Sequence, residues 1–316
     1  MHDLTRDLPT PALSLLLSRG HLIHSNGDIN AWLRNAFGLA HNPALAPLRL
    51  LGLTGESSAK RCLCIDPVNF SFVDRTVTVG KPEALQLTKD QAKALGEALA
   101  PVLHDIGDLE ITTPALWHLH VHESAAELPS FMPLADFIGR RAEQGLPADP
   151  MWRHLINETQ IMLHAHPVNQ EREERGLPRI NSIWPWGGGR LATDAKTEHD
   201  TVFSDNPVVQ GLAKLCRLEV KAPPQAWVSL PHRHPLIAVD CLASLRSQGD
   251  GLRWRDALAR LESTWFVPLQ RALHGGRLNG LKIILPDVNG DSQLAISRRS
   301  MLKFWRRPAP LTILTT

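Results

Sequence analysis

Apolar positions recur at intervals of three and four near both ends of the chain, which is the period of helices that bury one face. Residues 10–52 therefore read as short helices, with Gly20 and Gly38 placed where two of the stripes end. The same spacing predicts an amphipathic helix that reaches about His274, from the positions Trp254, Leu258, Leu261 and Trp265.

Residues 61–122 show a different pattern, in which short β-branched and aromatic runs surround one helix. Thr88 is the expected N-cap of that helix, with Gln91 at the capping-box position. The predicted strands are Cys62–Ile65, Val73–Val79, Leu109–Ile111 and Leu116–Val121. Farther along, the pattern predicts helices over residues 149–166 and 207–216, and strands over residues 226–229, 236–240, 281–285 and 293–296.

Strands that alternate with helices in this way favour an α/β fold with an α+β insert, in which a sheet is covered by helices. The expected organisation is a helical N-terminal segment (1–60), an α+β subdomain (61–130) and an α/β region (131–316), packed as one unit.

Composition restricts the function more than the fold. A chain of 316 residues with 43% hydrophobic residues, 21% charged residues and a net charge of +2 is typical of a soluble globular protein. Such a small net charge predicts no strong attraction to nucleic acid or to a membrane. No apolar run is long enough to span a bilayer, and no signal peptide is recognisable, so a cytoplasmic protein is expected. The four cysteines form no C-x-x-C pair, and Cys62 and Cys64 are expected to pack on one strand face.

Three histidines alternate along one predicted strand, which places His118, His120 and His122 on one face. Such a pair or triple can bind zinc if a further ligand converges from elsewhere. The favoured interpretation is a half-exposed edge strand with its histidines outward, because the intervening Trp117, Leu119 and Val121 form a matching apolar face.

A second cluster of unusual residues runs from His166 to Arg190. Trp184 and Trp186 would share one strand face, and the three glycines that follow them could present backbone N–H groups beside Arg190 as a cradle for phosphate or carboxylate. Asn169 and Arg172 lie one helical turn apart and could point at the same ligand. The predicted ligand-binding residues are Asn169, Arg172, Asn181, Trp186, Gly187, Gly188, Gly189 and Arg190. The alternatives are a buried Trp-rich strand closed by a tight turn, and a solvated helix with its glutamates paired to arginine.

This segment, H-P-V-N-x-x-R followed by N-S-I-W-x-W-G-x-G, resembles the archaeal-type, 2,3-bisphosphoglycerate-independent phosphoglycerate mutases of the alkaline-phosphatase superfamily. The layout of the whole chain is similar to the RpfE-type regulatory proteins of bacteria. The resemblance implies a mutase-like sheet covered by helices, with an insert that corresponds to about Arg61–His122. The helix with Arg255 and Glu262 also resembles its counterpart in this family.

The resemblance further implies two divalent metals, held by Asp and His, and a Ser or Thr that becomes phosphorylated. Most of those ligands are missing here. The first predicted segment lacks the implied Asp-Gly, Asp240 has no histidine in the residues that follow it, and Asp287 is followed by Val288 where a histidine is implied. Two carboxylates without histidine partners make a poor site for two metals.

The resulting hypothesis is a degenerate, non-catalytic regulatory protein on a mutase-like scaffold, which binds a small phosphorylated or carboxylate ligand and needs no cofactor. One alternative is a metal-dependent phosphotransferase or mutase-like enzyme, which would require Mn or Zn. A protein–protein adaptor and a nucleic-acid-binding regulator are the others. A small anionic metabolite and a protein are the expected partners, and a membrane is not.

The only basic cluster of the sequence lies near the C-terminus. It contains Arg298, Arg299, Lys303, Arg306 and Arg307, interleaved with Phe304 and Trp305. Such a cluster could contact nucleic acid or an acidic partner. The favoured interpretation is a solvated helix face with the two aromatic side chains tucked in.

Overall fold

The computed structural model describes residues 8–25, 29–73, 75–228, 230, 233–242, 245, 250–287, 290–309 and 311. The chain divides into two compact units. Unit 1 comprises Met1–Asn42, Lys196–Asp205 and Glu219–Thr316, and unit 2 comprises Pro43–Ala195 and Asn206–Leu218. The two boundaries expected at residues 60 and 130 both fall within unit 2. The helix at residues 45–54 packs on a sheet that also contains the strand at residues 182–189, so both belong to the same unit as residues 61–130.

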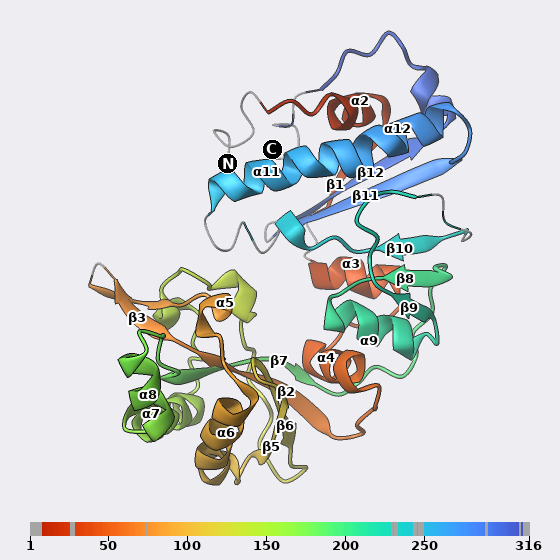
Figure 1. The fold of residues 1–316 in the computed structure, drawn as a ribbon. Helices are drawn as coiled ribbons and strands as arrows, with labels where there is room; N and C mark the ends of the chain where they lie inside the picture. Colours follow the sequence, from red (N-terminus) through yellow and green to blue (C-terminus); the bar gives the residue numbers. More distant parts are fainter. Residues whose placement is uncertain are drawn as a thin grey trace. The chain divides into compact units, whose positions relative to one another are not determined.

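Unit 2 is built on one antiparallel sheet with the strand order β5-β6-β2-β7 (Figure 1). Its strands are β2 (Arg61–Val68), β5 (Gly107–Thr113), β6 (Leu116–Val121) and β7 (Ser182–Gly189). Strand β2 is buried along its whole length, so it is apolar on both faces except at its charged positions.

Helices cover both faces of this sheet. One face, which includes Leu63, Trp117 and Ile183, packs against α6 (Lys89–Leu103) and α7 (Pro150–His164). The other face, which includes Cys62, Cys64 and Trp186, packs against α4 (Leu45–Thr54). Thr88 caps α6 by accepting the backbone N–H of Gln91, as predicted. The short helices α5 (Pro82–Leu85) and α8 (Pro167–Glu174) complete this part of the unit.

Helix α9 (Pro207–Leu215), which confirms the helix predicted over residues 207–216 and is capped by Asn206, crosses α4 at very short range. A Cβ atom on Gly52 would lie 1.8 Å from the backbone oxygen of Pro207, and one on Gly211 would lie 1.9 Å from that of Leu48. Only glycine at both positions allows the two backbones to approach so closely.

The predicted strand Val73–Val79 was wrong. These residues contain the end of β3 (Phe70–Val73), a turn and the whole of β4 (Thr76–Val79), and the two strands pair as a hairpin. The turn between them includes Arg75, whose φ of 64° lies in the left-handed region. Two 3-10 turns, η1 (Leu134–Asp136) and η2 (Ala142–Gln144), follow β6.

Unit 1 contains two small sheets. The first is antiparallel in the order β1-β12-β11, with β1 at His21–Ser25, β11 at Gly280–Asp287 and β12 at Gly290–Ser297. The second is parallel in the order β10-β8-β9, with β8 at Thr201–Phe203, β9 at Glu219–Lys221 and β10 at Pro235–Ile237. The predicted strand at residues 226–229 is absent from residues 226–228, and Ser229 lies outside the described residues.

The helices of unit 1 are α2 (Pro11–Arg19), α3 (Ile29–Ala36), α11 (Gly251–Leu261), a π-helical turn (Glu262–Phe266) and α12 (Val267–His274). The predicted amphipathic helix to His274 is therefore confirmed, with a π-helical turn in its middle. That turn positions Glu262, whose carboxylate accepts the backbone N–H groups of Ala12 (2.5 Å) and Leu13 (3.2 Å) at the start of α2.

The α/β class with sheets covered by helices is confirmed. No helix among the described residues combines the length and the apolar character needed to cross a membrane.

Candidate functional site

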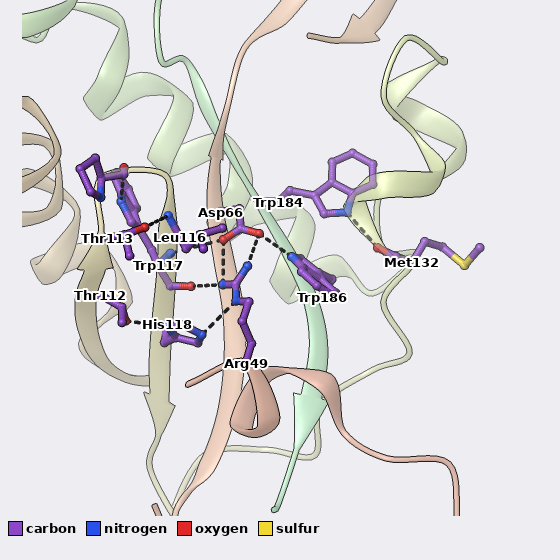
Figure 2. A network of polar contacts seen from close by, with 11 residues as sticks. Arg49, Asp66, Thr112, Thr113, Leu116, Trp117, His118, Met132, Trp184 and Trp186 are labelled. Carbon is purple, nitrogen blue, oxygen red and sulfur yellow. Dashed lines mark hydrogen bonds and ion pairs between the residues drawn. The ribbon is translucent and has the colours of Figure 1, made fainter. Parts of the chain in front are cut away.

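The most unusual polar feature of unit 2 is a charged network buried between α4 and the sheet (Figure 2). Arg49 of α4 donates two parallel hydrogen bonds to the carboxylate of Asp66 on β2, at 2.7 and 2.8 Å. Its remaining nitrogen, Nε, donates to Nε2 of His118 on β6 at 3.0 Å. All three side chains are buried, so this geometry ties one helix to two neighbouring strands through desolvated charges.

Two tryptophans complete the network. Trp186 on β7 donates its indole N–H to Asp66 at 2.7 Å, and its ring lies 5.1 Å from the guanidinium carbon of Arg49. Trp117 receives a hydrogen bond from Arg49 at its backbone oxygen (2.8 Å) and donates its backbone N–H to Asp66 (3.3 Å). Trp186, predicted to contact a ligand, is thus half-buried, and its indole N–H is used in the network.

The hydrogen bonds also determine the protonation of His118. Because arginine can only donate, Nε2 of His118 must accept, and its proton resides on Nδ1. Nδ1 then donates to the hydroxyl of Thr112 at 2.7 Å, and that hydroxyl donates to Glu110 at 3.2 Å. Burial, followed by the charges of Arg49 and His120, lowers the pKa of His118 to about 3.

We expect this histidine to make unit 2 sensitive to acid. Between its ordinary pKa of 6.5 and about 3, the unfolded chain binds a proton at His118 that the folded chain does not. Stability should therefore fall as the pH falls through this window, by up to about 1.4 kcal/mol per pH unit from this group. Urea unfolding at several pH values measures this dependence. The free energy of unfolding should fall less steeply with falling pH in His118→Gln than in the wild type. Equal pH dependence in the two proteins would contradict the lowered pKa of His118.

The two strand cysteines belong to the same buried face. Cys62 and Cys64 are buried and pack against α4, as predicted for packing thiols. Burial raises the pKa of Cys62 to about 12 and that of Cys64 well above its usual range. Neither thiol has the lowered pKa of a nucleophile.

Asn169 and Arg172, predicted to hold a ligand, are fully buried in the structure. The Asn169 amide donates to the backbone oxygens of Leu163 (2.8 Å) and Ile180 (2.7 Å), and its oxygen accepts the N–H of Ile180 (2.8 Å). Arg172 donates to Pro178 O (2.9 Å), to the side chain of Gln91 (2.8 Å) and to Leu85 O. The polar atoms of both residues are used in holding α8 and the following loop against the core.

The glycines at the end of β7 are explained by close packing. Gly187 and Gly189 have φ values of 67° and 147°, and a Cβ at these positions would meet Leu45 at 3.1 Å and Ala44 at 2.7 Å. The glycines therefore admit the chain that enters α4. They belong to a strand paired with β2, with a register shift between Cys62 and Cys64, so the alternative of a buried Trp-rich strand describes this segment.

Asn181 and Arg190 flank this strand at opposite ends. The Asn181 amide pairs with both backbone groups of Phe70, at 2.7 and 2.8 Å. Arg190 is more than half exposed and is paired with Glu123 at 2.6 Å and with Ala59 O at 2.8 Å. The eight predicted residues therefore do not gather around a single pocket.

The weaker candidates for metal binding are also separated. Strand β6 is paired on both sides, so the expected half-exposed edge was wrong. His118 bonds to Arg49, His120 pairs with Glu110 at 2.6 Å, and His122 pairs with Asp108 at 3.4 Å. Asp240 lies exposed beyond β10 and Asp287 ends β11, with its side chain outside the described part of the structure. Among the described residues, no group of three or more His, Cys, Asp or Glu could hold a metal ion.

A cavity of about 460 Å³ lies between the β3–β4 hairpin and α7 of unit 2. Its apolar wall comes from Phe70, Phe72, Val77, Ala142 and Leu146, and its polar wall comes from Ser71, Glu143, Asn157, Gln160, His164 and Asn181. Asn181 is the only predicted ligand residue that lines it. The amides at 157 and 160 were missed, although their spacing on the predicted helix was a usable signal.

The buried pair at the centre of the network, Arg49 and Asp66, was also not predicted. Arg49 is the one charge in an otherwise apolar helix, and Asp66 is the one carboxylate in an apolar strand. A lone cation in an apolar helix and a lone carboxylate in a buried strand together indicate a buried ion pair. That signal was available in the sequence.

The protein relatives agree with the resemblance. The 2,3-bisphosphoglycerate-independent phosphoglycerate mutase of Methanosarcina barkeri is 40% identical in an alignment 201 residues long, which covers 57% of this chain and 48% of that enzyme. The mutase of Methanosarcina mazei is 30% identical in an alignment 102 residues long, which covers 28% of this chain and 26% of that enzyme. The chain is a sequence relative of these mutases. It matches at most about half of their length.

Two further findings concern the fold. The solved PH0037 protein of Pyrococcus horikoshii aligns with 94% of this chain and 84% of its own, at 10% identity and a TM-score of 0.53. Identity this low shows a shared fold alone. No protein-family model matches the chain.

Proposed function

We propose that this relative of the mutases is a non-catalytic regulatory protein of the RpfE type, which acts in the cytoplasm by binding a ligand without converting it. The observation that carries the proposal is that the candidate site residues form hydrogen bonds within the protein itself. Asn169, Arg172, Trp186 and His118 are all hydrogen-bonded to other parts of unit 2, and three of them are fully buried. A side chain in this position stabilises the scaffold and is not available to a substrate.

The sequence supports the same proposal at the positions where the resemblance implies metal ligands. Asp240 lacks the implied histidine, and Val288 follows Asp287 where another histidine is implied. Phosphoryl transfer in this superfamily depends on metals that neutralise the phosphoryl oxygens and activate the nucleophile. The chain offers a small part of the donor set that this chemistry requires.

The ligand of the proposed regulator would occupy the cavity between the β3–β4 hairpin and α7. Its polar wall offers neutral amides from Asn157 and Gln160 and the ring of His164, and it includes the carboxylate of Glu143. No Arg or Lys is among the residues that line it. Amide and imidazole donors beside a carboxylate suit a small hydroxylated monocarboxylate better than a phosphate dianion.

The proposal is tested first by an activity assay. The purified protein, supplied with Mn²⁺ or Zn²⁺, should form no 2-phosphoglycerate from 3-phosphoglycerate, while the Methanosarcina barkeri mutase assayed in parallel does. Turnover that depends on metal would overturn the proposal.

Binding is measured separately, by thermal shift with glycerate and 3-phosphoglycerate in the presence of a chelator. A ligand at a hundredfold excess over its Kd stabilises the folded state by about 2.7 kcal/mol, which is readily detected. We expect glycerate to raise the melting temperature of the wild type and of Arg190→Ala, but not that of the cavity variant Asn157→Leu. A shift that requires metal, or one that survives in Asn157→Leu, would contradict the proposed site.

A further inference from the structure

The basic segment near the C-terminus of unit 1, residues 298–309, differs from its prediction in a way that suggests a second function. It contains a 3-10 turn, η4 (Arg299–Leu302), where a helix face was expected. The aromatic side chains are not tucked in, because Phe304 is 82% exposed and Trp305 is 68% exposed. Leu302 is 67% exposed beside them, so three large apolar side chains project from four consecutive positions.

The backbone of this segment is fixed to the rest of unit 1. Met301 is buried in the core, and its backbone oxygen accepts a hydrogen bond from Arg19 at 2.7 Å. Arg306 donates to Ser18 O at 3.0 Å, and Ala309 N donates to Ser14 O at 3.0 Å. The exposed apolar side chains are therefore displayed by an anchored turn, which lowers the entropic cost of using them as a contact.

Positive charge surrounds the apolar residues. The segment carries the cations Arg298, Arg299, Lys303, Arg306 and Arg307, and no Asp or Glu occurs between residues 298 and 309. Next to it lies a cavity of about 450 Å³, lined by Arg306, Arg307 and His21 together with Leu17, Ser18, Gly20, Leu22 and Ala309. Its two guanidinium groups suit an anionic group such as a phosphate.

We propose that the 298–309 segment is a docking surface for an anionic phospholipid bilayer. The apolar side chains of Leu302, Phe304 and Trp305 would enter the interface between headgroups and acyl chains, where Trp and Phe are favoured. The arginines would bind headgroup phosphates, and one phosphate would enter the cavity that Arg306 and Arg307 line. Such peripheral contact needs neither a membrane-spanning segment nor a large net charge over the whole chain, because the positive charge is concentrated in this one segment.

The same residues fit nucleic acid less well. Leu302 has no ring on which a base could stack, and Phe304 and Trp305 meet edge to face, with ring centroids 5.3 Å apart, so part of one face is covered. The net charge of the whole chain is only +2, whereas a nucleic-acid surface normally extends as a basic stripe over many phosphates. A small group of exposed apolar side chains surrounded by cationic residues is what binding to an anionic bilayer surface requires.

The test is cosedimentation of the full chain with vesicles of phosphatidylcholine alone or mixed with phosphatidylglycerol. We expect binding to the mixed vesicles only, weakened by added NaCl. Phe304→Ser with Trp305→Ser should weaken binding by more than about tenfold, because both rings would lose their burial. Arg306→Gln and Arg307→Gln should each weaken it by about fivefold.

Leu252→Ser is the control, since Leu252 of unit 1 is also exposed (78%) but lies outside the segment and is not among the residues that line the two cavities. The proposal is overturned if the mixed vesicles do not bind the protein, or if Leu252→Ser weakens binding as much as the double variant. It is also overturned if soluble glycerol phosphate binds at Arg306 and Arg307 as tightly as the vesicles do, or if a single-stranded oligonucleotide binds more tightly than the vesicles and depends on the same residues.

Discussion

Replacing Asp66 with asparagine should lower the free energy of unfolding of unit 2 by about 3–5 kcal/mol, the usual cost of removing one partner from a buried ion pair. Asp66 accepts two hydrogen bonds from Arg49 and one from the indole of Trp186. The amide NH₂ of asparagine would face one of these donors, and the buried guanidinium of Arg49 would lose its counter-charge. Urea unfolding followed by tryptophan fluorescence measures the change.

Asp108→Asn is the control for this substitution. Asp108 pairs with Lys60 at 3.7 Å and with His122 at 3.4 Å, but its side chain is 60% exposed. Removing these surface pairs should change stability far less than Asp66→Asn does. Comparable losses in the two variants would show that the burial of Asp66 is not what makes it important.

A double variant separates the pair from its surroundings. With Arg49→Met and Asp66→Leu combined, neither charge remains to be buried, so part of the loss should be recovered. Recovery would be incomplete, because Trp186 Nε1 and His118 Nε2 would each lose a partner. A double variant no more stable than Asp66→Asn would indicate that these neutral hydrogen bonds carry most of the network's stability.

Local structure was predictable where one rule dominated. The cap at Thr88 and the strand Leu116–Val121 follow from capping chemistry and period-two alternation. The hairpin within residues 70–79 was missed because Arg75 adopts a left-handed φ without being glycine. Strand β1 was missed because its sequence, HLIHS, does not alternate and is made regular only by pairing with β12.

The site was less predictable than the elements, for a physical reason. The part of the segment around Trp184 and Trp186 was correctly placed on a strand, with the two rings on one face. Whether its polar residues face solvent depends on what packs against it. Glycines and arginines that can cradle an anion can equally admit a neighbouring helix or bind backbone carbonyls, and the approach of residues 44–46 to β7 involves sequence separations that local patterns do not encode.

The substitution Arg172→Ala decides most directly whether this arginine binds a ligand or holds the fold together. Arg172 donates to two backbone oxygens and to the Gln91 side chain, and all of these acceptors would be left without their donor. At about 1–3 kcal/mol for each unsatisfied buried acceptor, we expect a total loss of about 3–5 kcal/mol in urea unfolding. Arg175→Ala on the same helix is the matched control, because its pair with Glu171 is exposed and should contribute less than about 1 kcal/mol.

The competing outcome is equally clear. If Arg172→Ala left the free energy of unfolding unchanged but abolished the thermal shift produced by glycerate or 3-phosphoglycerate, the guanidinium would be a ligand contact, and the pocket expected from the sequence would replace the cavity at α7. If the variant is destabilised while its remaining folded population still binds glycerate with wild-type affinity by calorimetry, Arg172 is a structural residue. The three hydrogen bonds that bury its guanidinium predict the second result.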